Sequence, residues 1–348
     1  MALAIKAVDH PNERKKHTAA IPRLGGVAIA IGLLFGVSTV GLMWQHWEFP
    51  LERQAVVSLS LGTFLIFLLG VVDDLIGVSA WKKLLIELIA ALPVVQVGWQ
   101  FHELAYPGGA IHLGPLSGAL TMIWIVGVTN AINLIDGLDG LASGVVAIIG
   151  LSLLIYSMAY QSPVGVVLTA GMVGSCLGFL PHNWEPARIF MGDSGSLTLG
   201  YLLGTLSVYT TLKSPAAVAI LVPILALGVP VIDTLLVMLV RFLERPKGVF
   251  TRRFLRMFHA DRNHLHHLME VIVGSRRPVV YWVYGMVLVS CSMALIVALT
   301  KRSGLGLILL AVELGAVAAV RRLGLAKKAR SIARRQREES AELRIDAQ

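Results

Sequence analysis

The chain contains few charged residues and almost no cysteine. Asp, Glu, Lys and Arg make up 15% of its 348 residues, whereas roughly a quarter of the residues in a soluble domain are charged. The mean hydropathy of +0.74 excludes an ordinary soluble enzyme of this length. Cys176 and Cys291 lie in separate apolar runs without the spacing of a metal site, so we expect both to be inert packing residues.

The chain also lacks the alternation of apolar and polar residues that membrane-barrel strands require. Instead, apolar runs of about 16 to 24 residues follow one another, which is the length of a helix that crosses a bilayer. We therefore predict an all-α fold, a polytopic integral membrane protein with about ten transmembrane helices. The predicted spans are 25–44, 55–72, 83–99, 118–135, 141–160, 164–181, 197–212, 215–238, 279–300 and 304–321.

Positive charge is concentrated on one side of the predicted membrane. Ten spans place both termini on the same side, and 26 of the 30 Lys and Arg residues fall there. This asymmetry is typical of the cytoplasmic face, so we predict that both termini are cytoplasmic. The net charge of +9 then indicates topology and contact with anionic membrane lipids, not nucleic acid.

One membrane domain is predicted over residues 1–322, followed by a charged cytoplasmic tail at 323–348. The tail could form a helix along lipid headgroups or stay partly disordered, and we expect no catalytic role for it. No internal repeat, soluble second domain or cleavable signal is evident, since Met1 to Val8 is too short for a signal core.

Against this apolar background, the segment NAINLIDGLDGLASG stands out at residues 130–144. Four polar residues step by three at the end of a predicted span, and neighbours three apart lie close on a helix. Helix capping could explain one such residue, but not four of them accompanied by two glycines. The four are Asn130, Asn133, Asp136 and Asp139.

Further acidic residues follow two other predicted spans. Asp73 and Asp74 precede Lys83, and adjacent carboxylates are costly unless a cation or proton is shared between them. They could form an acid–base or metal-proximal pair, or a solvated turn that lysine neutralises. Asp193, in the glycine-rich turn MGDSGS, could cap a helix or hold Mg²⁺ to a diphosphate. The turn lacks the Gly-Lys-Ser/Thr ending of a P-loop.

A histidine cluster and two basic segments complete the polar inventory. His264, His266 and His267 form an H-x-H-H pattern without the cysteines or spacing of a zinc site. Together with nearby arginines they suit a diphosphate and sugar hydroxyls, although a His-rich surface loop is the alternative. The nearby arginines are Arg252, Arg253, Arg256 and Arg262, and the leader 8–26 carries Arg14, Lys15, Lys16, His17 and Arg23.

All of these clusters fall on the predicted cytoplasmic side. Carboxylates, amides, histidines and guanidinium groups at one membrane face fit metal-assisted phosphoryl transfer, in which positioning and charge neutralisation supply most of the catalysis. An ion-coupled transporter using Asp73, Asp136 and Asp233 as a relay is the alternative from another class. Transporters place such groups near the midplane, however, and here only Asp233 lies deep in a predicted span.

The chain resembles the polyprenyl-phosphate N-acetylhexosamine-1-phosphate transferases, of the glycosyltransferase family 4 type. This family includes the bacterial phospho-MurNAc-pentapeptide and GlcNAc-1-phosphate transferases, and the H-x-H-H form is closer to the GlcNAc branch. Family members usually carry a membrane helix before the leader, and here only Met1 to Val8 precede it. The matching segments are DHPNERKKH with PRLGG, VVDD with the following Lys, NAINLIDGLDGLASG, RIFMGDSGSLTLG and DRNHLHHL.

The resemblance implies a bacterial inner-membrane enzyme with a cytoplasmic site, which moves GlcNAc-1-phosphate from UDP-GlcNAc to undecaprenyl phosphate and releases UMP. The product would initiate a surface polysaccharide. Another UDP-N-acetylhexosamine donor, such as a 6-deoxy sugar or the MurNAc-pentapeptide, is the alternative. The required cofactor would be Mg²⁺, with Mn²⁺ as a substitute, and a homodimer is one assembly that the resemblance allows.

The resemblance also carries residue roles. Asp193 matches the family's metal ligand, and Asp73 matches a proposed base, although already ionised lipid phosphate could attack directly. Asp74 would support the metal or Lys83. The catalytic set is Asp73, Asp74, Lys83, Asp136, Asp139, His264, His266 and His267; the substrate-binding set is Asn130, Asn133, Asn183, Phe190, Arg252, Arg253 and Arg262.

Overall fold

The computed structural model describes residues 8–9, 21–43, 53–106, 108–212, 218, 220–243 and 263–345. Its helices are α1 (Gly25–Met43), α2 (Arg53–Ile76), α3 (Ala80–Gln96), α4 (Leu116–Ile135), α5 (Leu141–Ala159), α6 (Pro163–Asn183), α7 (Gly192–Leu212), α8 (Leu221–Ala226), α9 (Gly228–Leu243), α11 (Leu265–Val273), α12 (Arg276–Thr300) and α13 (Ser303–Ile345). Two short antiparallel pairs join β1 (Val8–Asp9) to β2 (Ile21–Pro22) and β3 (Glu103–Tyr106) to β4 (Gly109–His112).

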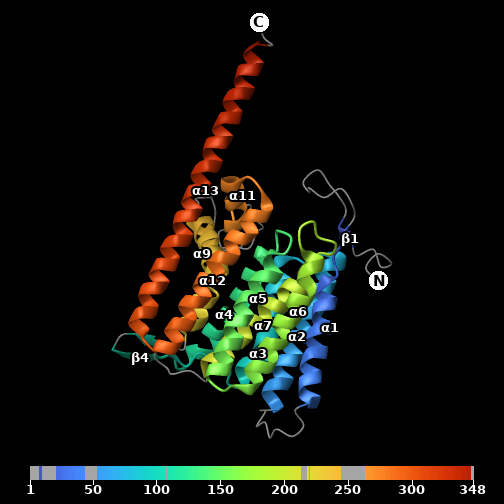
Figure 1. Ribbon diagram of the computed structural model, residues 1–348, viewed down its shortest axis with the longest axis vertical. Helices are drawn as coiled ribbons and strands as arrows, with labels where there is room; N and C mark the ends of the chain where they lie inside the picture. The colour runs from blue at the N-terminus through green and yellow to red at the C-terminus, as the bar shows by residue number, and fades with distance from the viewer. Residues whose placement is uncertain are drawn as a thin grey trace.

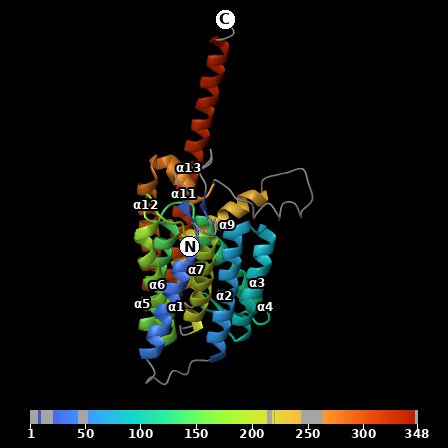
Figure 2. The same ribbon diagram turned by 90° about the vertical axis from the view of Figure 1, so that its right-hand side faces the viewer.

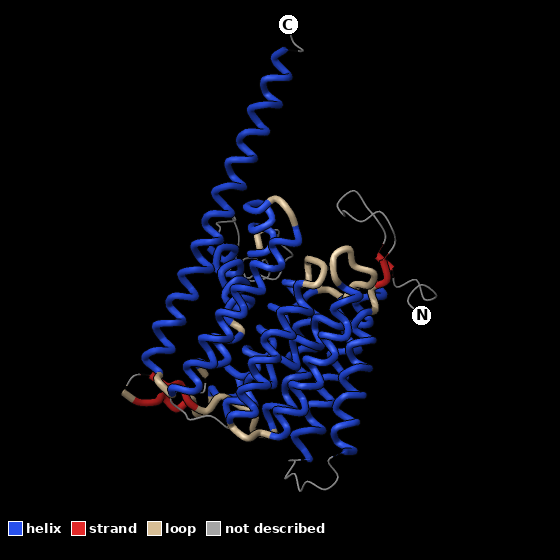
Figure 3. The backbone as a smooth tube through the Cα atoms, viewed as in Figure 1, coloured by secondary structure: helices blue, strands red, loops and turns tan. Residues whose placement is uncertain are grey.

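The long helices form a bundle in which most of them run along one axis (Figures 1 and 3). The short helix α11, strand β1 and the far end of α13 lie at one end of the bundle, while β3 and β4 lie at the opposite end (Figure 1). We call the end with α11 the site end. Because successive helices alternate in direction, the links α2–α3, α4–α5 and α6–α7 all reach the site end.

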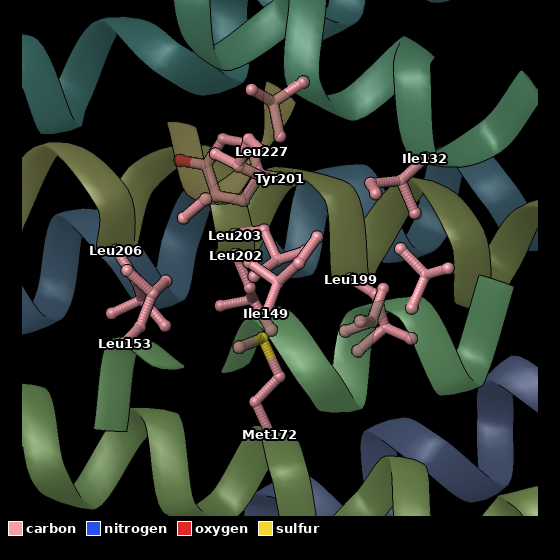
Figure 4. Packing of buried hydrophobic residues seen from close by; sticks show 14 of the residues in the cluster. Ile132, Ile149, Leu153, Met172, Leu199, Tyr201, Leu202, Leu203, Leu206 and Leu227 are labelled. Carbon is pink, nitrogen blue, oxygen red and sulfur yellow. The ribbon is translucent and has the colours of Figure 1, made fainter. Parts of the chain in front are cut away.

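Helix α7 is the centre of the bundle. Every residue from Ser194 to Thr211 is buried, and the helix packs against α1, α2, α4 and α5. Figure 4 shows its leucines among Ile149, Leu153 and Met172 in this core. Its hydroxyl side chains donate to carbonyls of their own helix, as Thr198 does to Ser194 and Thr205 to Tyr201. A helix with no face toward lipid can therefore carry many polar residues.

The predicted span 215–238 is not one continuous helix. Helix α8 ends at Ala226 and α9 begins at Gly228, and α9 is inclined to the other helices (Figure 2). Pro230 has no N–H to donate to the carbonyl oxygen of Ala226, four residues earlier. That oxygen instead accepts from Sγ of Cys291 at 3.7 Å. Both cysteines are buried and free, as expected.

Six helices of the described chain are long and apolar enough to cross a membrane. They confirm a polytopic all-α membrane protein, whereas the number of ten spans stays a prediction. The six are within α2, α4, α5, α6, α12 and α13, and α1 contributes a shorter apolar stretch, Gly25–Thr39. The sequence did not predict the β3–β4 hairpin, and the predicted domain boundary at 322/323 falls inside the continuous helix α13.

Gly70 lets α2 approach the first turn of α7. A Cβ at this position would lie 2.4 Å from the Cα of Ser194 and 2.5 Å from the carbonyl oxygen of Asp193. Overpacking of this kind costs about 1–3 kcal/mol, so Gly70→Ala is expected to lower the apparent Tm of the protein in detergent. Gly127→Ala is the matched control, since nothing lies within 4 Å of its added Cβ. An equal Tm for both variants would contradict this account of the packing.

Candidate active site

The ammonium group of Lys83 joins two of the predicted carboxylates. Its Nζ lies 2.8 Å from Oδ2 of Asp73 and 2.5 Å from Oδ2 of Asp193. Asp73 is at the end of α2, Lys83 is in the first turn of α3 and Asp193 begins α7. The backbone N–H of Val78 also donates to Oδ1 of Asp73 at 2.6 Å. The structure thus brings residues from three segments into one ionic cluster.

Asp74 turns away from this cluster toward the N-terminus of α7. Its two carboxylate oxygens accept from the backbone N–H groups of Asp193 at 2.8 Å and Ser194 at 3.0 Å. The first N–H groups of a helix have no partner within the helix and carry partial positive charge, so a carboxylate is well placed there. Asp74 therefore fixes the position from which Asp193 projects.

Asp136 lies just beyond α4, at the position that follows Ile135. Burial raises the pKa of its carboxyl group from 3.8 to about 8 because a low-polarity environment disfavours the charged form. The nearby carboxylates of Asp193, Asp74 and Asp139 raise this pKa further. The surroundings of Asp136 therefore favour the protonated carboxyl group over the charged one.

Asp139 and Asn183 hold the loop 184–191 against the α4–α5 link. Oδ2 of Asp139 accepts from the N–H of Ala187 at 2.9 Å. Oδ1 of Asn183 accepts from the N–H of Gly140 at 3.0 Å, and its Nδ2 donates to the carbonyl of Ile189 at 3.0 Å. The carbonyl of Gly140 also accepts from the hydroxyl of Tyr284 on α12, at 2.5 Å. These contacts shape the loop. The catalytic role of Asp139 and the substrate-binding role of Asn183 stay predictions.

The two asparagines of α4 face neighbouring helices. Nδ2 of Asn130 donates to Oε2 of Glu87 on α3 and to the carbonyl of Val126 at 2.9 Å. Oδ1 of Asn133 accepts from the hydroxyl of Ser196 on α7 at 2.8 Å. Glu87 is buried and has one carboxylate oxygen without a hydrogen-bond partner. Sequence reasoning missed Glu87, although its position one helical turn after Lys83 was a signal.

Phe190 lies where the leader meets the loop before α7. Its N–H donates to the carbonyl of Pro22 at 2.8 Å, and its carbonyl accepts from the N–H of Gly25 at 3.0 Å. Its side chain is half-buried. The Pro-Arg-Leu-Gly-Gly segment predicted from the leader is therefore packed against the site.

The three histidines lie together on α11 and at its start. The rings of His264 and His266 are parallel within 11°, with centroids 6.2 Å apart, and the ring of His267 is 4.1 Å from that of His266. Burial first, and then His267, lowers the pKa of His266 to about 3. Both ring nitrogens of His266 are buried without a hydrogen-bond partner, and its Nε2 faces the space beside Gly137. Helix α11 thus reaches the aspartate-bearing link.

Some predicted residues lie outside the described residues. Among them are three substrate-binding arginines, Arg252, Arg253 and Arg262, and part of the basic leader, Arg14, Lys15, Lys16 and His17.

The model of a family described as glycosyl transferase family 4 matches residues 56–211, which contain Asp73, Lys83 and Asp193. A probable undecaprenyl-phosphate N-acetylglucosaminyl 1-phosphate transferase of Bacillus subtilis is 38% identical over 288 residues, covering 82% of this chain and 75% of the relative. The chain belongs to glycosyl transferase family 4. The histidine helix of this family 4 member lies beyond the matched residues.

Two other relatives represent further branches. A decaprenyl-phosphate N-acetylglucosaminephosphotransferase of Mycolicibacterium smegmatis is 33% identical over 312 residues, with 82% of this chain and 73% of the relative covered. A phospho-N-acetylmuramoyl-pentapeptide-transferase of Lactobacillus johnsonii is 32% identical over 301 residues, with 79% and 84% covered. Both similarities extend over most of this family 4 chain.

The raised pKa of Asp136 predicts a pH-dependent stability. Between pH 3.8 and about pH 8 the folded protein keeps a proton that the unfolded chain has lost, so stability falls as the pH rises through this window. Asp136→Asn removes this titration and is expected to flatten the fall in apparent Tm between pH 5 and 8, measured without added divalent cations.

The control for that comparison is Gly127→Ala, which changes no titratable group and adds a Cβ with nothing within 4 Å. It should retain the wild-type slope. If Asp136→Asn and the wild type lose stability in parallel with rising pH, Asp136 does not hold the extra proton.

Proposed function

We propose that this protein transfers GlcNAc-1-phosphate from UDP-GlcNAc to undecaprenyl phosphate and releases UMP. The observation that carries the proposal is the cluster of Lys83 with Asp73 and Asp193, which lies at one end of an apolar bundle. This position suits a reaction between a water-soluble donor and a lipid acceptor. The relatives' names support the same pair of substrate classes.

In the proposed reaction, a phosphate oxygen of the lipid attacks the β-phosphorus of the donor. A new P–O bond forms, the bond from that phosphorus to the bridging oxygen breaks, and the electron pair leaves with UMP. Ionised lipid phosphate needs no base for this attack. Asp73 is bonded to Lys83 and to the N–H of Val78, so we assign it to positioning the ammonium group beside the phosphates.

We propose that the site also takes a magnesium ion. Asp193 supplies hard carboxylate oxygens, and the carboxyl group of Asp136, whose pKa is raised by burial and then by Asp193, Asp74 and Asp139, lies in the same acidic surroundings. Among the residues that the structure describes, no group of three or more His, Cys, Asp or Glu side chains could hold a metal ion. We propose Asp193 as the protein ligand, with water and substrate phosphates completing the shell, as is usual for Mg²⁺. The bound ion would neutralise charge developing on the phosphates.

The experiment is a donor panel with purified protein, undecaprenyl phosphate and Mg²⁺. UDP-GlcNAc, UDP-linked 6-deoxy N-acetylhexosamines and UDP-MurNAc-pentapeptide are each supplied, and UMP and the lipid product are measured by mass. We expect release of UMP with UDP-GlcNAc and loss of it on chelation of Mg²⁺. Product formation with another donor alone would correct the sugar and keep the reaction.

Asp193→Asn is expected to reduce turnover by on the order of 100-fold or more, because it removes the carboxylate proposed to hold Mg²⁺, whose charge would act on the transferring phosphate. Glu103→Gln, at the far end of the bundle, should retain wild-type turnover. Normal Mg²⁺-dependent turnover by Asp193→Asn would rule out its assignment as the metal ligand.

The site end is proposed to face the cytoplasm of a bacterial inner membrane, where nucleotide sugars are made. Ser275→Cys places a thiol in an exposed position at the site end, and Ala110→Cys places one on β4 at the opposite end. A maleimide that does not cross membranes should label Ala110→Cys in intact spheroplasts and Ser275→Cys only after permeabilisation. The reverse pattern would invert the proposed topology.

A further inference from the structure

Asp233 is a buried carboxylate at the junction of three helices. It lies on α9, is 1% exposed, and accepts hydrogen bonds from α11 and α13 as well as from the residue that precedes α11. Nδ1 of His264 lies 3.0 Å from its Oδ2, and the N–H of Leu265 lies 3.0 Å from each oxygen. Nη1 of Arg321 completes the set. None of the roles assigned above explains this arrangement.

The contact fixes the state of the His264 ring. An ionised carboxylate only accepts hydrogen bonds, so Nδ1 of His264 must carry the hydrogen that points to Asp233. The other nitrogen, Nε2, is then left for a partner outside this pair. The ring cannot rotate without losing its bond to a buried charge.

The same carboxylate fixes the beginning of the histidine helix. His264 occupies the N-cap position of α11 but makes no side-chain capping bond. Asp233, from another helix, supplies the missing acceptor for the N–H of Leu265. Because His266 and His267 follow within the first turn, their positions depend on where this turn begins.

Helix α13 holds α11 from the other side. Arg321 pairs with Asp233, and Gly324 packs so closely that a Cβ there would lie 2.6 Å from the Cβ of Leu268. Nζ of Lys327 donates to the carbonyl of Ile272 at 2.9 Å, and Nζ of Lys328 donates to Oδ1 of Asn263 at 2.7 Å. One face of α13 therefore supports both ends of α11.

We propose that Asp233 and Arg321 are positioning residues for phosphosugar transfer, and that they act through His264 and the first turn of α11. The proposal rests on the proposed function. Arg321 neutralises a carboxylate that would otherwise be an unpaired buried charge. Asp233 in turn orients the histidines toward the link that carries Asp136. Helix α13, which carries Arg321, then contributes to the geometry of the site.

The main experiment is a double-mutant cycle on the full chain with Asp233→Asn, His264→Ala and the two combined. Loss of an orienting partner is expected to lower kcat on the order of 10- to 100-fold, with a KM for the donor within about threefold of the wild type. Because Asp233 acts partly through His264 and partly through the first turn of α11, the two losses should overlap, and the double variant should lose less than the product of the single losses. Multiplying losses in the double variant would overturn the proposal.

Three variants distinguish a positioning role from a role in folding alone. Asp233→Asn combined with Arg321→Met removes both charges together, so it avoids leaving either charge buried alone. We expect it to fold and to show the same fall in kcat. Arg321→Lys, which keeps the charge, should restore more kcat than Arg321→Met. A folded neutral pair with wild-type kcat would disprove a positioning role.

Glu313→Gln is the matched control on the same helix. Glu313 is also a buried carboxylate of α13, and its Oε1 accepts from the hydroxyl of Ser290 on α12 at 2.5 Å. Its described partners lie away from α11, so the variant should keep kcat within about twofold of wild type. An equal fall in kcat for Glu313→Gln and Asp233→Asn would mean that any disturbance of α13 suffices, and would overturn the specific role.

A spectroscopic measurement tests the pair without any substrate. In ¹⁵N-histidine-labelled protein in lipid nanodiscs, the His264 signals are assigned by their loss in His264→Gln. We expect Nδ1 to carry a hydrogen and its signal to shift in Asp233→Asn but not in Glu313→Gln. A His264 protonated only at Nε2 would overturn the proposal. Absence of UMP from the wild type with every donor would instead disprove the proposed function, and the ring signals would still report on Asp233.

Discussion

The ammonium group of Lys83 is the contact on which the site depends. Two carboxylates from different helices repel one another at short range unless a cation lies between them, and the low polarity of a membrane bundle strengthens both the repulsion and its relief. Lys83 bonds to Asp73 and Asp193 and so joins the ends of α2, α3 and α7. Without this cation, the carboxylates of Asp73 and Asp193 would repel one another and destabilise the junction of these helices.

The three aspartates of the site that Lys83 does not contact are of two kinds. Asp74 is satisfied by the first N–H groups of α7 and Asp139 by the N–H of Ala187. Asp136 has no comparable hydrogen bond among the described contacts, and burial raises its pKa to about 8. The site thus separates carboxylates that hold the backbone from one that is left for a cation or a proton. Of the two aspartates in the α4–α5 link, Asp139 is therefore the one that holds the loop.

Much of the fold, and the gathering of the described candidate residues at one end of the bundle, followed from the sequence, because each signal was local. Apolar run length predicted the helices, and the alternation of their direction gathered the motifs at one end. Glu87, Tyr284 and Arg321 were missed because their roles depend on contacts between distant helices. The break at Leu227 was missed because a run of apolar residues conceals the lost N–H of Pro230. Asp233 was recognised as unusual, but only the structure shows that His264 and Arg321 meet it.

The interior position of α7 has a consequence for how the chain enters the membrane. This helix carries Asp193 and a series of hydroxyl side chains, and it is not among the six described helices apolar enough to cross a bilayer by length and composition. Insertion machinery that sorts segments by their transfer free energy into lipid would hold it poorly as a single segment. We therefore expect its entry into the bilayer to depend on α2 and α4, which pack against it in the folded bundle. The residue proposed to hold the metal is therefore carried by a helix whose place in the bilayer depends on its neighbours.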